Sequence, residues 1–145
     1  MCALRLSTGL RTAMIGSDDF KGLMDGAFLD IYSGAQPASA DAVETGTKLV
    51  SVTAAAGSDG GTFGTAATGV LPKSAGVWSG TVATEGIAGW GRLYGPGKTT
   101  GSSGTAYRMD MSVGLSGADL VLSHTNLKVD TVLTIKTFSL TQPAE

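Results

Sequence analysis

The chain has 145 residues, a formal net charge of −2 at pH 7 and only 15% charged residues, against roughly 25% in an average soluble protein. The length fits one domain, and the absence of a cationic surface excludes phosphate backbones and anionic membranes, so we expect no nucleic-acid and no membrane partner. The single cysteine, Cys2, excludes an intrachain disulfide and a cysteine-rich zinc site. A surface made largely of Gly, Ser, Thr and Ala favours burial in an assembly over a neutral monomer, because few ions would lose water.

The first 25 residues carry the predicted helices. Ser7 is the expected N-cap of a helix that runs through Ile15 and is interrupted directly after it. Ser17 is expected to cap a second short helix, with acidic residues in its positive first turn, and Gly26 to end it. We therefore predict one domain over 1–145, with residues 1–25 as an N-terminal helical arm.

Everything after this arm has the pattern of strands and turns. About eight strand-like runs follow at the spacing of sandwiches and barrels, so the predicted fold is mainly β, an antiparallel, jelly-roll-like β-sandwich. The run 107–113 is the clearest, because odd positions such as Met109 and Met111 are apolar and even positions such as Arg108 and Asp110 are polar. One face of this strand is expected to be buried and the other wet or paired.

Other segments predict specific connections. The runs 77–83 and 87–94 are expected to form a hairpin at Glu85–Gly86 and, with 107–113, a meander. The last run, TVLTIKTFSL, has apolar or β-branched residues on both faces and is expected to be covered on both, either centrally in a sandwich or by a neighbouring subunit. The glycine-rich segment 57–69 is expected to be an irregular loop or a weak edge, and Ser33–Thr47 a long loop.

No motif assembles a catalytic or cofactor site. The segment GPGKTT lacks the first glycine of a phosphate-binding loop, since Arg92 stands in its place, and the following TTGSSG is a poor helix former. His124 is the only histidine, without the further ligands of a metal site, and the scattered acidic residues form no glycosidase pair. We predict a protein that is not an enzyme and has no cofactor and no metal, with a loop calcium left open.

Four aromatic residues allow two interpretations. Trp78, Trp90, Tyr94 and Tyr107 lie on successive predicted strands and could form a sugar-stacking platform. They could equally pack between two sheets, and two tryptophans in one predicted hairpin are more often anchors of a core. The core is the favoured interpretation.

Four segments together carry a resemblance: LRLSTGLRTAMIG, DIYSGAQPASADAVETGTKLV, GWGRLYG and TFSLTQPA. In these the chain resembles small structural proteins encoded among the virion genes of tailed double-stranded DNA bacteriophages. The resemblance implies no catalytic residues. It implies a β-rich component of the particle, of the kind seen in capsid cement or decoration proteins, which are commonly jelly-roll-like sandwiches clustered as trimers.

These observations predict a cement protein on the phage head, made in the host cytoplasm, homotrimeric and bound to the major capsid protein across neighbouring capsomers. A tail, baseplate or adaptor component, with a receptor or glycan contact, is the alternative. The N-terminal segment is expected either to dock on a neighbour or to cap its own sandwich, and the long loop is a candidate contact. The predicted partner-contact residues are Leu4, Arg5, Leu6, Leu10, Arg11, Met14, Gln36 and Pro37.

Overall fold

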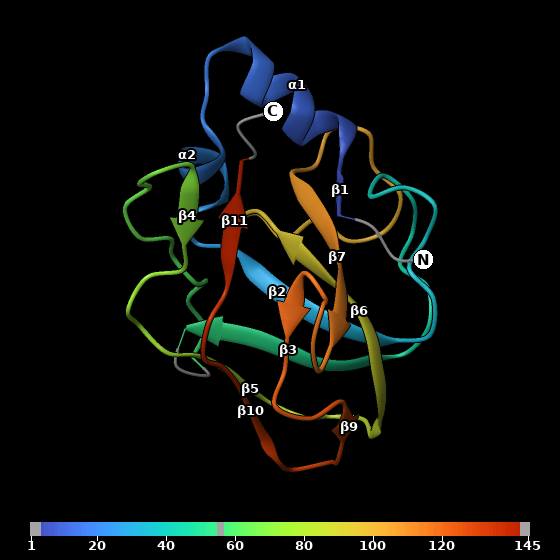
Figure 1. Ribbon diagram of the computed structural model, residues 1–145. Helices are drawn as coiled ribbons and strands as arrows, with labels where there is room; N and C mark the ends of the chain where they lie inside the picture. Colours follow the sequence, from blue (N-terminus) through green and yellow to red (C-terminus); the bar gives the residue numbers. More distant parts are fainter. Residues whose placement is uncertain (1–3, 55–56, 143–145) are drawn as a thin grey trace.

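The computed structural model describes residues 4–54 and 57–142, which contain two helices and eleven strands joined by turns and loops (Figure 1). The helices are α1 (Thr8–Gly16) and α2 (Phe20–Met24). The strands are β1 (Arg5–Leu6), β2 (Phe28–Ser33), β3 (Lys48–Ala54), β4 (Val70–Pro72), β5 (Trp78–Thr81), β6 (Gly86–Tyr94), β7 (Arg108–Gly114), β8 (Leu120–Val121), β9 (Asn126–Leu127), β10 (Val132–Ile135) and β11 (Ser139–Thr141). The prediction of a mainly β, antiparallel protein with a short helical segment is confirmed; Cys2 lies outside the described residues.

Nine of these strands belong to one large sheet. Its order is β1-β7-β6-β2-β3-β5-β10, with β8 beside β7 and β9 beside β6, and β4 and β11 form a small second sheet. The pairings are antiparallel except for β7 with β8. In Figure 1 the helices lie at one end of the molecule, and β9 and β10 at the other.

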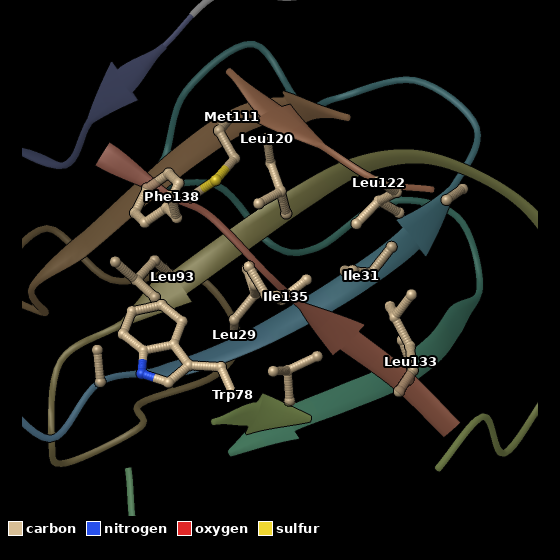
Figure 2. Packing of buried hydrophobic residues seen from close by; sticks show 14 of the residues in the cluster. Leu29, Ile31, Trp78, Leu93, Met111, Leu120, Leu122, Leu133, Ile135 and Phe138 are labelled. Carbon is tan, nitrogen blue, oxygen red and sulfur yellow. The ribbon is translucent and has the colours of Figure 1, made fainter. Parts of the chain in front are cut away.

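The apolar core lies on one face of this sheet. Alternate residues of β2, β6 and β7 point into it, including Leu29, Ile31 and Leu93, because side chains of a strand alternate between the two faces. Figure 2 shows Leu133 and Ile135 of β10 packed above the strand that carries Leu29 and Ile31. The end of the sheet and the small sheet thus close the core in a sandwich-like arrangement.

The N-terminal segment is an integral part of this domain. Ser7 caps α1 as predicted, since its Oγ accepts the Leu10 N–H at 3.3 Å. Asp19, not Ser17, caps α2, because Ser17 ends α1 through its own N–H to the Ala13 carbonyl, at 3.3 Å. Strand β1 pairs with β7 and Leu10 is fully buried in the core. Residues 4–25 therefore cap the protein's own sheet.

The predicted hairpin at Glu85–Gly86 is wrong. Strand β5 pairs with β3 and β10, whereas β6 pairs with β2, β7 and β9. The backbone between them is already used elsewhere, because the N–H groups of Val82 and Ala83 donate to the carbonyls of Thr131 and Leu49, both at 2.9 Å. The chain consequently passes from one part of the sheet to another at this turn.

The last long run is covered on one face only within the chain, so its predicted central place in a sandwich is wrong, while cover by a neighbouring subunit stays a prediction. Strand β10 lies at the end of the large sheet, and its alternate residues are buried and exposed. Leu133 and Ile135 are buried, whereas Val132 is 61% exposed. The same run bends after Ile135 and places Phe138 in the core before β11 begins.

Candidate functional site

A row of polar residues crosses the face of the large sheet opposite the core. The register places Arg5 of β1 opposite Asp110 of β7, then Arg92 of β6, Asp30 of β2 and Ser51 of β3. Directly opposed residues point to the same face of a sheet, so these five side chains form one ladder. The charges alternate in sign along this row, and the row ends at the hydroxyl of Ser51.

The centre of the row is a buried ion pair. Arg92 donates from Nε to Asp110 Oδ1 at 2.6 Å and from Nη2 to Asp110 Oδ2 at 2.8 Å, and both side chains are fully buried. Burial by itself lowers the pKa of Arg92, but the Asp110 carboxylate outweighs it and holds that pKa above its ordinary value. The two-point geometry offsets the cost of removing both ions from water.

The second acidic position of the row fixes another loop. Asp30 Oδ1 accepts hydrogen bonds from Ser51 Oγ at 2.6 Å and from Lys98 Nζ at 2.9 Å. Lys98 belongs to the GPGKTT segment, which connects the antiparallel strands β6 and β7. Its ammonium group thus has an internal carboxylate partner at the sheet face.

Three arginines from neighbouring strands hold the 34–47 loop. Arg5, Arg92 and Arg108 lie on β1, β6 and β7, and each donates to a main-chain carbonyl of this loop. The accepting carbonyls are those of Pro37 for Arg5, Ala42 for Arg92 at 2.8 Å, and Ala40 for Arg108 at 3.4 Å. A loop without regular backbone pairing is thereby fixed to the sheet by charge-assisted hydrogen bonds.

Aromatic residues fill the space between the row and the loop. Trp90 stacks on Tyr32, with ring centroids 4.6 Å apart, and donates from Nε1 to the Thr45 carbonyl at 3.2 Å. The hydroxyls of Tyr32 and Tyr94 lie 2.9 Å apart. Burial raises the pKa of Tyr32 to about 12 and also raises the pKa of Tyr94, so both stay neutral donors.

The predicted aromatic core is in fact divided between two faces. Trp78 lies in the apolar core, while Trp90 and Tyr94 lie fully buried on the charged face. Neither tryptophan is accessible to a sugar from solvent, and Tyr107 is 38% exposed. The structure therefore supports the interpretation that the two tryptophans stabilise the fold.

The 34–47 loop turns both of its acidic side chains inward. Asp41 accepts the Thr8 N–H at Oδ1 and the Thr8 hydroxyl at Oδ2, at 2.8 and 2.6 Å. Glu44 Oε1 accepts the Tyr94 hydroxyl at 2.8 Å, and Oε2 accepts the Gly101 N–H at 3.1 Å. The exposed residues of the loop are all uncharged: Gly34, Ala35, Ala38, Ser39, Val43, Thr45, Gly46 and Thr47.

Three of the predicted contact residues meet in one place. Leu4, Leu6 and Met14 line an open groove of about 290 Å³ between β1, the helices and the small sheet. Phe20 and Leu71 also line it. The prediction of partner contacts at the groove residues stays a prediction.

Two other predicted contact residues are buried within the chain itself. Leu10 is fully buried because it faces the protein's own core from α1. Pro37 of the loop is buried, and its carbonyl accepts the Arg5 hydrogen bond. Arg11 is exposed and donates to the Thr8 hydroxyl at 3.0 Å, and Gln36 is half-buried.

The remaining candidate sites contain little assembled chemistry. A pocket of about 520 Å³ lies between the β6–β7 connection and α2, with Tyr107, Thr99 and Leu23 among its lining. His124 is exposed, and its Nδ1 lies 3.1 Å from the Oγ of its neighbour Ser123. Among residues 4–54 and 57–142, no group of three His, Cys, Asp or Glu side chains could hold a metal ion, and no helix is long and apolar enough to cross a membrane.

The comparisons with known proteins give no relative: no protein-family model, curated protein or solved structure matches the chain.

The row of charged residues was only half predicted from the sequence, since Arg108 and Asp110 were expected to be wet or paired. The same alternation in LDIYS and GWGRLYG places Asp30 and Arg92 on one face. That shared signal could have identified the row.

Proposed function

We propose that the protein is a virion structural protein of a tailed double-stranded DNA bacteriophage, a capsid cement protein that binds the major capsid protein across neighbouring capsomers as a homotrimer. The observation that carries this proposal is the neutral, firmly held 34–47 loop. Its acidic side chains are turned inward and its exposed residues are uncharged. The loop also contains GAQPASADA, residues 34–42, which is part of one of the segments that carry the phage resemblance.

A fixed neutral loop suits binding to a repeating shell. Association costs less when the binding segment is already ordered, and uncharged groups lose little when water is displaced. On a symmetric lattice, many modest contacts add up, so no single contact needs high affinity. The low charge content of the whole chain agrees with such burial.

The copy number in purified particles tests the proposal first. Quantitative mass spectrometry against the major capsid protein should give a count on the order of hundreds per particle for a lattice protein. Particles that lack the protein should lose their DNA at lower temperature. A count of a few to a few tens would instead support the tail, baseplate or adaptor alternative, and unchanged heat stability would contradict cementing.

A pair of matched variants tests the loop itself. Val43 in the loop is 56% exposed and Val77, before β5, is 54% exposed, so replacing either by Asp should leave the fold intact. Val43→Asp should weaken binding to protein-free capsids by about tenfold, since a charge would be desolvated in the contact. Val77→Asp should bind as the original protein does. Equal binding by both variants would exclude the loop as the contact.

A further inference from the structure

Both acidic residues of the 34–47 loop serve as its attachments. Asp41 holds the loop to the start of α1 through Thr8. Glu44 holds it to β6 through Tyr94 and Arg92, whose Nη1 lies 3.3 Å from Glu44 Oε1, and to the β6–β7 connection through the Gly101 N–H. Two of the points that fix this segment are thus carboxylates, in addition to its bonds from Arg5, Arg92 and Arg108 to main-chain carbonyls.

The groups that face these carboxylates come from every element packed on the loop. Around Glu44 they are Arg92 and Tyr94 of β6, Tyr32 of β2 and the Gly101 amide. Around Asp41 they are Thr8 and Arg11 of α1 and Arg108 of β7. The charged groups among them are all cationic, so each carboxylate is stabilised in its ionised form.

We propose that the 34–47 loop is an acid-released cover: protonation of Asp41 and Glu44 frees it from the sheet and uncovers Trp90, while the apolar core stays folded. This conformational device is independent of the proposed function, because it concerns only contacts within one chain. Its basis is the separation of the two faces. The core cluster contains only apolar residues, whereas both acidic attachments of the loop lie on the other face.

The directions in which the pKa values of Glu44 and Asp41 are shifted indicate the pH at which the loop would be released. Burial alone would raise the pKa of Glu44, but hydrogen bonds from its own amide, Tyr94 and Gly101, with the charge of Arg92, lower it below 4.5. The Thr8 hydroxyl is the main cause that lowers the pKa of Asp41 below 3.8, despite partial desolvation. Folded pKa values below the unfolded ones mean that both attachments are complete above about pH 4.5 and are lost as the pH falls through the folded values.

The exposure of Trp90 measures the release directly. In the full chain with Trp78→Phe, Trp90 is the only tryptophan, and its quenching by acrylamide can be followed from pH 7 to pH 2.5 alongside the far-ultraviolet circular dichroism of the strands. We expect quenching to rise severalfold below pH 4.5 while the strand signal is unchanged. Quenching that rises only when the strand signal disappears would overturn the proposal.

Substitutions that remove the carboxylate charges should reproduce the acid effect at neutral pH. The variant Asp41→Asn with Glu44→Gln should show high, pH-independent quenching of Trp90 at pH 7. The matched control Glu85→Gln, on an exposed turn, should behave as the parent does. Full protection of Trp90 in the double variant at pH 7 would overturn the proposal.

A third measurement uses neither Trp78→Phe nor the double variant, so that misfolding of those variants cannot produce its result. The difference between the quenching of the unmodified protein and that of Trp90→Phe isolates the Trp90 signal, because Trp78 remains in the apolar core of both. This difference should grow below pH 4.5 at constant strand signal. A difference that stays flat down to global unfolding would exclude an acid-released cover.

Discussion

The two faces of the large sheet use opposite chemistry within the same strands. On β6, Leu93 points into the apolar core and the adjacent Arg92 points to the other face. On β7, Met111 and Asp110 are divided in the same way. All four side chains are fully buried, so exposure does not distinguish the two faces.

The two faces differ in the kind of interaction that stabilises each of them against the segments packed on it. The apolar face is stabilised by area removed from water, which has no preferred direction and tolerates many partners of suitable shape. The charged face is stabilised only where each donor meets an acceptor. The charged residues named above on this face are balanced, with four cations and four anions: Arg5, Arg92, Lys98 and Arg108 with Asp30, Asp41, Glu44 and Asp110.

This contrast explains why regular structure covers one face and loops cover the other. Main-chain carbonyls in a loop are not used by a sheet, so they can accept hydrogen bonds from Arg5, Arg92 and Arg108. A strand or helix would offer few free carbonyls. The arginines therefore select an irregular cover and hold it in one conformation.

The largest expected effect comes from breaking the central ion pair. Asp110→Ala should lower the free energy of unfolding by about 3–5 kcal/mol, because Arg92 would remain buried without its two-point carboxylate partner and with only the 3.3 Å contact to Glu44. Urea unfolding at pH 7 measures the change. A loss below about 1 kcal/mol would mean that water or a shifted side chain replaces the carboxylate.

A double variant separates the pair from its surroundings. Arg92→Met combined with Asp110→Leu removes both charges together and should recover most of the stability lost in Asp110→Ala, since apolar residues can replace a buried ion pair. The Arg92 bond to the Ala42 carbonyl is lost in this variant. Any remaining deficit therefore reports the contribution of the loop attachment.

The adjacent position gives the second largest effect, on the opposite face. Leu93→Ala should cost about 3 kcal/mol, because it leaves a cavity in a fully buried cluster. The loss should be the same at pH 7 and at pH 3.5, since the core cluster contains no titratable group. A cost that changes strongly with pH would show that the two faces are coupled across the strand.

The sequence allowed the strands and one buried face to be predicted. Alternation in 107–113 placed Met109 and Met111 in the core, and Ser7 was correctly identified as a helix cap. Both signals are local, since they depend on the period of a strand and on one side chain near an N–H group. The mainly β, antiparallel class followed from them.

Strand partners and the charged layer could not be predicted in the same way. The Glu85–Gly86 turn has the composition of a hairpin, yet β5 pairs with β3 and β10, because long-range backbone hydrogen bonds outweigh the local signal. Similarly, Glu44 is distant in sequence from Arg92 and Gly101, and only the register of four strands brings them together. Composition suggested a neutral surface but not where the charges were buried.

The third prediction compares the faces by their response to acid. Glu44→Gln should cost about 1–2 kcal/mol at pH 7, since a charged acceptor loses its ionic hydrogen bonds. The folded pKa of Glu44 lies below 4.5, so this cost should shrink as the pH falls through that value. Urea unfolding at pH 7, 4.5 and 3.5 tests it, and a cost that is equal at all three would remove Glu44 from the ionic layer.

The smallest effect is expected for the same substitution on an exposed turn. Glu85 Oε2 lies 3.7 Å from Lys128 Nζ, but both side chains are more than half exposed, at 65% and 61%. Water screens such a pair and the long side chains lose entropy in making it, so Glu85→Gln should change the free energy of unfolding by less than about 0.5 kcal/mol. Because both variants exchange glutamate for glutamine, the difference between Glu44→Gln and Glu85→Gln isolates the effect of location. Equal costs would mean that burial and the fixed donors around Glu44 add nothing to stability, and that the loop is held by its arginine–carbonyl bonds and by Asp41.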